Sequence, residues 1–190
     1  MSLSVILGPV NSGKTTALLD EASRVSAVGL RGLYVNSVID TRNNDCVSTH
    51  NPLLSYKEKL IHITFLKISH LSELDVSGYD ALFIDEAQFF EDLLPAVKRF
   101  MDNDRKYVWV AGLSGDFNRA RFGQILDLLP LCAANHVIFK SSYCTRCARN
   151  KRLLVDAPYS YRLNREERAQ IAVGKKYESL CAECYRESSA

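Results

Sequence analysis

The segment that decides how this sequence is interpreted is Gly8-Pro9-Val10-Asn11-Ser12-Gly13-Lys14-Thr15. It fits the pattern G-x-x-x-x-G-K-[ST] at every fixed position, and this pattern is typical of a loop that holds the phosphates of a nucleoside triphosphate. Residues 3–7 form an apolar run before the segment, and residues 16–22 form a helix-favouring run after it. The sequence therefore predicts a strand, a phosphate-binding loop and a helix in the order that this chemistry requires.

The residue types in this loop have separate physical roles. Gly8 and Gly13 allow the backbone to curve around an anion, so that successive N–H groups point at phosphate oxygens. The positive end of the following helix dipole adds to this attraction. Lys14 is expected to bridge the outer phosphates, and the Thr15 hydroxyl is expected to ligate Mg²⁺. Every residue from Gly8 to Thr15 is thus a candidate for binding ATP, and the alternative is a glycine-rich turn that only packs.

Length and composition are those of an ordinary globular protein. The chain has 190 residues, of which 47% are hydrophobic and 24% are charged. A chain of this length buries about 70% of its unfolded surface, which is enough for one core and a small appendage. No apolar run approaches the roughly 18 residues of a membrane span, and the first strand does not resemble a signal peptide. We therefore expect a cytoplasmic protein without a membrane partner, in which the six cysteines form no disulfide framework.

The net charge of +2 argues against a nucleic-acid partner. Basic side chains outnumber acidic ones in residues 141–190, whereas acidic ones are in slight excess in residues 1–140. The basic excess is too small to track a polynucleotide, and it suits ATP phosphates or solvent equally well.

Apolar runs alternate with helical patterns over the first three quarters of the chain. An amphipathic helix is predicted at residues 90–101, and further strands are predicted at residues 33–38, 61–66, 81–84, 107–111 and 137–139. This alternation predicts an α/β fold with a mostly parallel sheet and helices on both faces. It stops near residue 141, so we expect a nucleotide-binding domain at residues 1–140 and a second, smaller domain at residues 141–190.

Two acids, Asp85 and Glu86, directly follow the apolar strand predicted at residues 81–84. In phosphate-loop proteins an acid at this strand end approaches Mg²⁺ from the side opposite the loop, which makes Asp85 the candidate. Adjacent strand residues point to opposite faces, so Glu86 is free to act on a water or an acceptor hydroxyl beyond the γ-phosphate. Gln88 is placed to orient the same acceptor. The alternative is that both acids are solvated in a loop.

Four cysteines form two C-x₂-C pairs, Cys144 with Cys147 and Cys181 with Cys184, separated by 33 residues. Two such pairs supply the four thiolates of a tetrahedral, structural Zn²⁺ site with no open position for chemistry. The separation exceeds the 15–20 residues that are usual for a minimal zinc ribbon, so an inserted loop is expected at about residues 153–168. Cys132 lies outside the pairs and is interpreted as a core residue.

Taken together, these motifs resemble the cellular-type thymidine kinases. The resemblance runs in order along nearly the whole chain, and its most specific part is the combination of the acidic motif with the late cysteine pairs. It is carried by the phosphate loop, Asp85-Glu86-Ala87-Gln88-Phe89-Phe90, Leu113-Ser114-Gly115-Asp116-Phe117, Arg121-Phe122-Gly123 and the four cysteines.

The resemblance implies transfer of a phosphoryl group from ATP to the 5′-hydroxyl of thymidine, with deoxyuridine as a second acceptor, in pyrimidine deoxynucleotide salvage. It also implies a RecA-like domain, a zinc-held lasso loop over the nucleoside, and a homotetramer. Glu86 resembles the general base on the 5′-hydroxyl, and Asp85 resembles the acid on the magnesium side.

Other roles follow from the same resemblance. Asp40-Thr41-Arg42 resembles a D-T-R segment whose arginine lies near the transferring phosphate, so Asp40 and Arg42 are expected on the ATP side. Gln88 is also counted among the residues expected there. The residues expected to contact the nucleoside are Val10, Phe89, Phe117, Phe122, Arg168, Ala169, Gln170, Ile171, Ala172 and Tyr177.

The sequence departs from the family pattern in its phosphate loop. Val10 and Asn11 stand where the family commonly has methionine and phenylalanine. The counterpart of Val10 borders the 5-substituent of the base, so we expect altered discrimination there.

Two other functions remain open at this point. A nucleic-acid-dependent ATPase also carries D-E-A-Q after a strand, but it needs a second domain of the same kind and a strongly basic track. A zinc-ribbon binding protein that only senses nucleotide would bind ATP without acceptor-dependent release of ADP. Tyrosines near the cysteines would then stack on bases.

Overall fold

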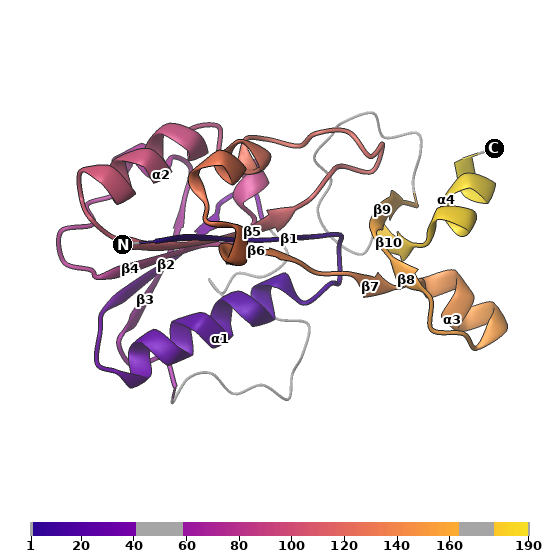
Figure 1. The fold of residues 1–190 in the computed structure, drawn as a ribbon, viewed down its shortest axis with the longest axis horizontal. Helices are drawn as coiled ribbons and strands as arrows, with labels where there is room; N and C mark the ends of the chain where they lie inside the picture. The colour runs from indigo at the N-terminus through magenta and orange to yellow at the C-terminus, as the bar shows by residue number, and fades with distance from the viewer. Residues whose placement is uncertain (1, 41–58, 164–176, 190) are drawn as a thin grey trace.

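A computed structural model describes residues 2–40, 59–163 and 177–189 (Figure 1). Within these residues, six parallel strands form one sheet in the order β3-β2-β4-β5-β1-β6. The strands are β1 (Leu3–Gly8), β2 (Gly32–Ser37), β3 (Ile63–Ile68), β4 (Ala81–Ile84), β5 (Tyr107–Leu113) and β6 (Val137–Phe139). The α/β class with a parallel sheet is confirmed.

Alternating side chains divide the core between the two faces of the sheet. On β1, Val5 packs into the cluster on one face and its neighbour Ile6 into the cluster on the other. Val35 and Tyr34 on β2 are divided in the same way, because successive residues of a strand point to opposite faces. Both faces are therefore covered, as parallel sheets require.

One long helix covers each face. Helix α1 (Lys14–Ala27) buries Leu18, Leu19 and Ala22 against the face that carries Ile6, and α2 (Leu93–Asp102) lies on the opposite side of the sheet (Figure 1). The buried residues of α2 recur with a helical period of three to four: Leu93, Ala96, Val97 and Phe100. Short 3₁₀ turns complete this region: η1 (Leu71–Glu73), η2 (Ala87–Phe89), η3 (Ile125–Leu131) and η4 (Ala134–His136).

The remaining described elements belong to a smaller unit, which we call the cysteine module (residues 141–163 and 177–189). Strands β7 (Ser142–Tyr143) and β8 (Asp156–Ala157) form one antiparallel pair, and β9 (Tyr159–Arg162) and β10 (Tyr177–Leu180) form another. Two short helices, α3 (Thr145–Lys151) and α4 (Ala182–Ser189), follow β7 and β10. The small core of the module contains all four paired cysteines.

Every predicted strand and the predicted helix are present, with small shifts at their ends. Strand β3 begins at Ile63, which pairs with Gly32, whereas Ile61 is 73% exposed and precedes the ladder. The expectation of a loop at residues 153–168 is partly wrong, because strands β8 and β9 lie within this range. Their partners, β7 and β10, flank the cysteines and supply the hydrogen bonds that order this segment.

The parallel arrangement brings several strand ends to one edge of the sheet. Gly8, Ile84 and Leu113 end β1, β4 and β5, and the chain leaves β6 for the cysteine module at the same edge (Figure 1). Ligands of open α/β sheets bind at this carboxyl edge. Among the described residues, none of the helices combines the length and apolar character that a membrane span needs.

Candidate functional site

The phosphate loop joins β1 to α1 at the carboxyl edge. Gly13 has a left-handed backbone (φ 76°) directly before the first residue of α1, which is a conformation that favours glycine. At Gly8 a Cβ atom would lie 2.5 Å from the carbonyl oxygen of Lys140, so only glycine fits there. The Lys14 ammonium donates to the Pro9 carbonyl at 2.7 Å and is 7% exposed. The lysine therefore lies folded over its own loop, where phosphate oxygens would be held.

Thr15 and Asp85 are in contact, although 70 positions separate them in the sequence. The Thr15 hydroxyl donates to Oδ2 of Asp85 at 2.9 Å. The Tyr34 hydroxyl donates to the same oxygen at 2.8 Å, and the Glu86 N–H donates to Oδ1 at 2.9 Å. The structure thus brings the loop hydroxyl and the first acid together, as the motif spacing predicts.

Burial changes the acidity of Asp85. Desolvation, together with the neighbouring Glu86 carboxylate, raises the pKa of Asp85 to about 6, and the hydrogen bonds from Tyr34 and Thr15 only partly oppose this rise. A buried carboxyl group with a raised pKa is stabilised in its ionised form by a nearby cation. The Thr15 and Asp85 oxygens are hard donors of the kind that Mg²⁺ prefers, so these residues fit that ion.

Glu86 follows Asp85 with a left-handed backbone (φ 48°, ψ 43°), which is strained for a residue with a side chain. Its carboxylate is buried, at 8% exposure for the residue, and Oε2 accepts a hydrogen bond from Nε2 of Gln88 at 2.6 Å. Oε1 of Gln88 accepts from the Leu113 N–H at 3.1 Å. Gln88 therefore fixes the Glu86 carboxylate to the end of β5.

Two glycines leave just enough space for Gln88. A Cβ atom on Gly112 would lie 2.7 Å from Oε1 of Gln88. A Cβ atom on Gly123, which has a left-handed backbone (φ 63°), would lie 2.4 Å from the Gln88 carbonyl oxygen. The sequence places Gln88 beside the acceptor, and the structure adds that its side-chain amide is bonded to Glu86 and β5.

Asp40 lies just after β2 and is 2% exposed. Its Oδ2 accepts from Nδ2 of Asn36 at 3.2 Å, and its carbonyl oxygen accepts from the Lys67 ammonium at 3.0 Å. Arg42, the other residue expected on the ATP side of this segment, lies outside the described residues.

The three phenylalanines expected around the base occupy two places. Phe89 and Phe122 form an edge-to-face pair, with ring centroids 5.7 Å apart and planes at 82°. Phe117 instead lies under the Arg162 guanidinium, 3.9 Å from its ring centroid, and Arg162 also donates to the Tyr177 hydroxyl at 2.8 Å. Arg162 is 2% exposed, so the cysteine module inserts a cation between two of the expected nucleoside contacts.

The expected contacts Arg168, Ala169, Gln170, Ile171 and Ala172 lie outside the described residues. Tyr177 is described and begins β10.

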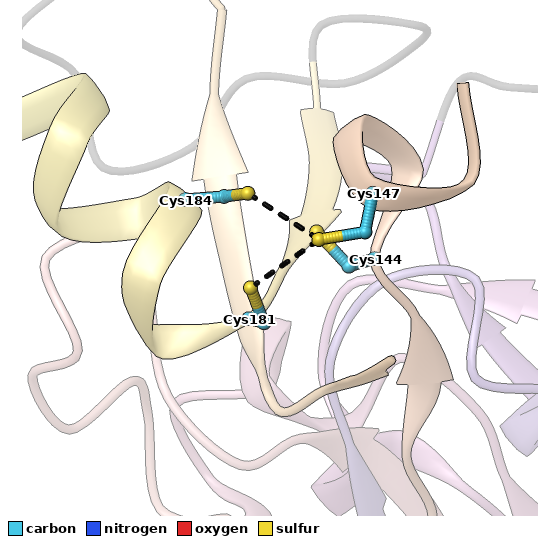
Figure 2. A group of neighbouring side chains, drawn as sticks. All are labelled: Cys144, Cys147, Cys181 and Cys184. Atoms are coloured by element: carbon cyan, nitrogen blue, oxygen red, sulfur yellow. Dashed lines mark hydrogen bonds between the residues drawn. The ribbon is translucent and has the colours of Figure 1, made fainter. Parts of the chain in front are cut away.

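The four cysteines converge in the cysteine module (Figure 2). All four are buried, and their sulfur atoms lie within 4.8 Å of one another. The Sγ atom of Cys147 is 3.6 Å from that of Cys184 and 3.9 Å from that of Cys181. A tetrahedral zinc with Zn–S bonds of about 2.3 Å requires sulfur separations of about 3.8 Å. The donor set therefore fits a structural Zn²⁺ ion.

The acidities of these thiols also differ from those of isolated cysteines. Burial raises the pKa of Cys144, but hydrogen bonds from the Cys147 and Cys181 backbone N–H groups outweigh it and lower the pKa to about 7. Burial and the neighbouring thiols raise the pKa of Cys184. Crowded thiolates of this kind are held together by a cation, because metal binding deprotonates every ligand. None of the described cysteines, Cys132 included, forms a disulfide bond.

Four residues of the site were missed from the sequence. Tyr34 has a detectable signal, because a tyrosine inside an apolar strand needs a partner for its hydroxyl. Ser160 and Ser179 carry no such signal, yet both contact Val10: the Val10 N–H donates to the Ser160 hydroxyl at 3.0 Å, and the Ser179 hydroxyl donates to the Val10 carbonyl at 2.7 Å. The fourth is Arg162.

Comparisons with known proteins agree with this site. The model of a family described as thymidine kinase matches residues 1–185. The chain is 34% identical over 186 residues to the cytosolic thymidine kinase of Bos taurus, covering 96% of this chain and 71% of that protein. The chain is 32% identical over 189 residues to the cytosolic thymidine kinase of Cricetulus griseus, covering 99% of this chain and 74% of that protein. It is 30% identical over 187 residues to the thymidine kinase of variola virus, covering 98% of this chain and 97% of that protein.

Proposed function

The chain belongs to the thymidine kinase family, and from this premise we propose how its residues transfer the γ-phosphoryl group of ATP to the 5′-hydroxyl of thymidine. The family assigns a nucleoside kinase of nucleotide salvage. The roles of individual residues are proposed below from the geometry of the carboxyl edge.

On the ATP side, the phosphate loop from Gly8 to Thr15 holds the triphosphate with its backbone N–H groups. Lys14 exchanges the Pro9 carbonyl for phosphate oxygens when ATP binds, because the ammonium already lies over the loop. Thr15 and Asp85 would hold Mg²⁺, which supplies neutralisation of the charge that develops on the phosphates. Asp40 and Arg42 complete this side in the proposal.

The observation that carries the proposal is the fixed carboxylate of Glu86. It directly follows Asp85, which is bonded to the loop hydroxyl of Thr15, and Gln88 holds it in place. Glu86 accepts the proton of the 5′-hydroxyl while the 5′-oxygen forms a bond to the γ-phosphorus. At the same time the bond between the γ-phosphorus and the bridging oxygen of ADP breaks. A positioned base of this kind contributes about 10²–10⁴-fold to the rate.

On the nucleoside side, the edge-to-face pair of Phe89 and Phe122 borders the base, and Phe117, Tyr177 and Val10 are proposed as further contacts. A pocket gains only about 1–3 kcal/mol from a methyl group. Discrimination between thymidine and deoxyuridine at the 5-position is therefore modest, and deoxyuridine is proposed as a second acceptor. Residues 168–172 are proposed to supply the contacts to the pyrimidine edge.

The four cysteines hold a structural Zn²⁺ ion, and the chain divides between residues 140 and 141 into a nucleotide-binding domain and a zinc-binding lasso domain. The relatives from Bos taurus and Cricetulus griseus are named cytosolic, which supports a cytoplasmic location here. A homotetramer is proposed from the family alone.

The experiment that tests this function measures ADP release from ATP and Mg²⁺ with a panel of pyrimidine and purine nucleosides, with and without a chelator. We expect release with thymidine, less with deoxyuridine, and little with purine nucleosides or after chelation. Release that is stimulated by a polynucleotide and not by thymidine would favour the ATPase. ATP binding without acceptor-dependent release would favour the nucleotide sensor.

A further inference from the structure

The cysteine module contacts the phosphate loop through a pair of serines. Ser160 on β9 and Ser179 on β10 are direct partners in the antiparallel ladder, so their side chains lie on the same face of the hairpin. Both point at Val10: Ser160 accepts its N–H at 3.0 Å, and Ser179 donates to its carbonyl at 2.7 Å. Both hydrogen-bonding groups of one loop residue are thus held by one hairpin.

Both serines are buried, and Val10 is half-buried. Ser160 is 3% exposed and Ser179 is 1% exposed. A buried hydrogen bond whose partner is removed leaves a polar group unsatisfied, and this costs more than the loss of an exposed bond. The pair of serines, which we call the serine clamp, therefore restricts the loop conformation at Val10.

The clamp acts at the point where the loop changes direction. Asn11, the next residue, has a left-handed backbone (φ 57°). On the other side of Val10, Gly8 packs against the Lys140 carbonyl, and the Lys140 N–H donates to the Leu7 carbonyl at 2.7 Å. The first half of the loop is thus held by residues that follow the sheet in the sequence.

The clamp is also tied to the cysteine cluster. Ser179 lies two positions before Cys181, and its carbonyl accepts a hydrogen bond from the Thr145 hydroxyl at 3.3 Å. Thr145 lies between Cys144 and Cys147, and Leu180 is fully buried among the cysteines. Whatever holds the four sulfur atoms together therefore also sets the position of Ser179.

We propose that Ser160 and Ser179 are positioning residues that couple the metal-holding cysteine cluster to the phosphate loop. Through them the structural metal supports nucleotide binding as well as the nucleoside side of the site. The proposal rests on the kinase function above and deepens it, because it names residues that prepare the loop for ATP without touching the reacting atoms.

The test uses the full chain with the variants Ser160→Ala, Ser179→Ala and their combination. Hydrogen exchange is measured in peptides that cover residues 8–15, and ADP affinity is measured by titration without nucleoside. We expect faster exchange in these peptides and a loss of ADP affinity of about two- to tenfold for each variant, the range that one hydrogen bond supports.

Two further sets of variants exclude a general loss of stability. Ser160→Thr and Ser179→Thr keep the hydroxyl group and should restore slow exchange and ADP affinity. Ser188→Ala is the matched control, because Ser188 lies in the same module, is half-buried and donates to the Cys184 carbonyl within α4. It should leave both measurements at the wild-type values.

Chelation tests the link to the metal. Removing the metal should speed exchange in residues 8–15 of the wild type, and it should add little in the double alanine variant, where the clamp is already absent. An equal acceleration in both proteins, or none in the wild type, would overturn the coupling. Wild-type exchange and ADP affinity in the double variant would overturn the clamp itself.

The kinase assignment is tested separately by thymidine-dependent ADP release from the wild type. If the wild type phosphorylates thymidine and the double variant binds ADP equally well, only the clamp proposal fails. If the wild type does not phosphorylate thymidine, the kinase assignment fails, whatever the exchange measurements show.

Discussion

The sheet region and the cysteine module hold their functional residues by different means. Around the sheet, the residues that fix Asp85 and Glu86 rest on two apolar clusters that fill both faces. In the module, half of the buried residues that form the core are the four cysteines themselves. We therefore expect that a site residue near the sheet can be changed without unfolding its surroundings, whereas a change to one of the four clustered cysteines unfolds the module.

The largest effect is expected from a cysteine substitution in the module. If the module stayed folded after this substitution, the contrast between the two regions would not hold. Cys147→Ser should remove the zinc and unfold the module, because a structural zinc contributes on the order of 10 kcal/mol to folding of its domain. Metal content, and limited proteolysis within residues 141–189, measure both effects. The sheet region should keep its cooperative thermal transition.

Cys132→Ser is the matched control for this substitution. Cys132 is half-buried and lies outside the sulfur cluster, where it donates to the Leu128 carbonyl. This variant should keep its zinc and its resistance to protease. A Cys147→Ser protein that retains zinc and an intact module would show that the small apolar core is sufficient.

Near the sheet, Glu86→Gln is expected to slow the phosphoryl transfer without lowering the stability of the fold. The amide cannot take the proton of the 5′-hydroxyl, so kcat should fall by about 10²–10⁴-fold. ADP affinity should stay within about twofold, and the unfolding temperature should change little. Steady-state kinetics and nucleotide titration measure these quantities, and a kcat above a tenth of wild type would remove Glu86 from the role of base.

A smaller effect is expected for Gln88→Leu. The change frees the Glu86 carboxylate and leaves the Leu113 N–H unpaired, so kcat should fall about tenfold, the factor that a change of about 1.4 kcal/mol in the barrier produces. The KM for ATP should change little. Gln124→Leu is the control, because Gln124 accepts from the Leu94 N–H and touches no part of the carboxylate pair. It should lower stability and leave kcat unchanged; equal losses of kcat in both variants would assign Gln88 a structural role alone.

The last expected effect is a pH dependence of stability that comes from Asp85. Its pKa is raised from 3.8 to about 6 in the folded protein, so the native state binds a proton more tightly than the unfolded state does. The free energy of unfolding should therefore fall as pH rises from about 4 to about 6. In Asp85→Asn this contribution is absent, and the variant should gain stability relative to wild type over that interval.

Denaturant titrations of both proteins at several pH values, without Mg²⁺ or nucleotide, measure the difference. A difference between their free energies of unfolding that stays constant with pH would show that Asp85 titrates at its ordinary value. If Asp85→Asn instead lost stability relative to wild type as pH rises, the fold would stabilise the ionised carboxylate of Asp85.

Much of this fold is predictable because its signals are local. Residues 81–84 are uniformly apolar and precede two acids, which is typical of a buried parallel strand at a functional edge. The four cysteines are predictable as a cluster because metal ligands recur at fixed spacing. In both cases a short stretch of sequence carries enough physical chemistry to determine its own role.

The residues that were missed depend on contacts between distant segments. Ser160 meets Val10 across 150 positions, and no local pattern distinguishes it from a surface serine. Strands β8 and β9 are short and polar, and they form only because partners near the cysteines complete their ladders. The sequence predicts only that Gln88 lies beside the acceptor. Its hydrogen bond from the Leu113 N–H is not predictable, because it depends on where the end of β5 lies in the fold.

The two glycines around Gln88 have a consequence for natural and laboratory variation. Any side chain at Gly123 would collide with the Gln88 backbone in a left-handed conformation that L-residues rarely adopt, and any side chain at Gly112 would displace the Gln88 amide. A random mutagenesis screen for inactive enzyme should thus recover substitutions at both glycines. Such variants would keep the phosphate loop, Asp85 and Glu86, and we expect them to lose activity because the Glu86 carboxylate would lose its hydrogen bond to Gln88.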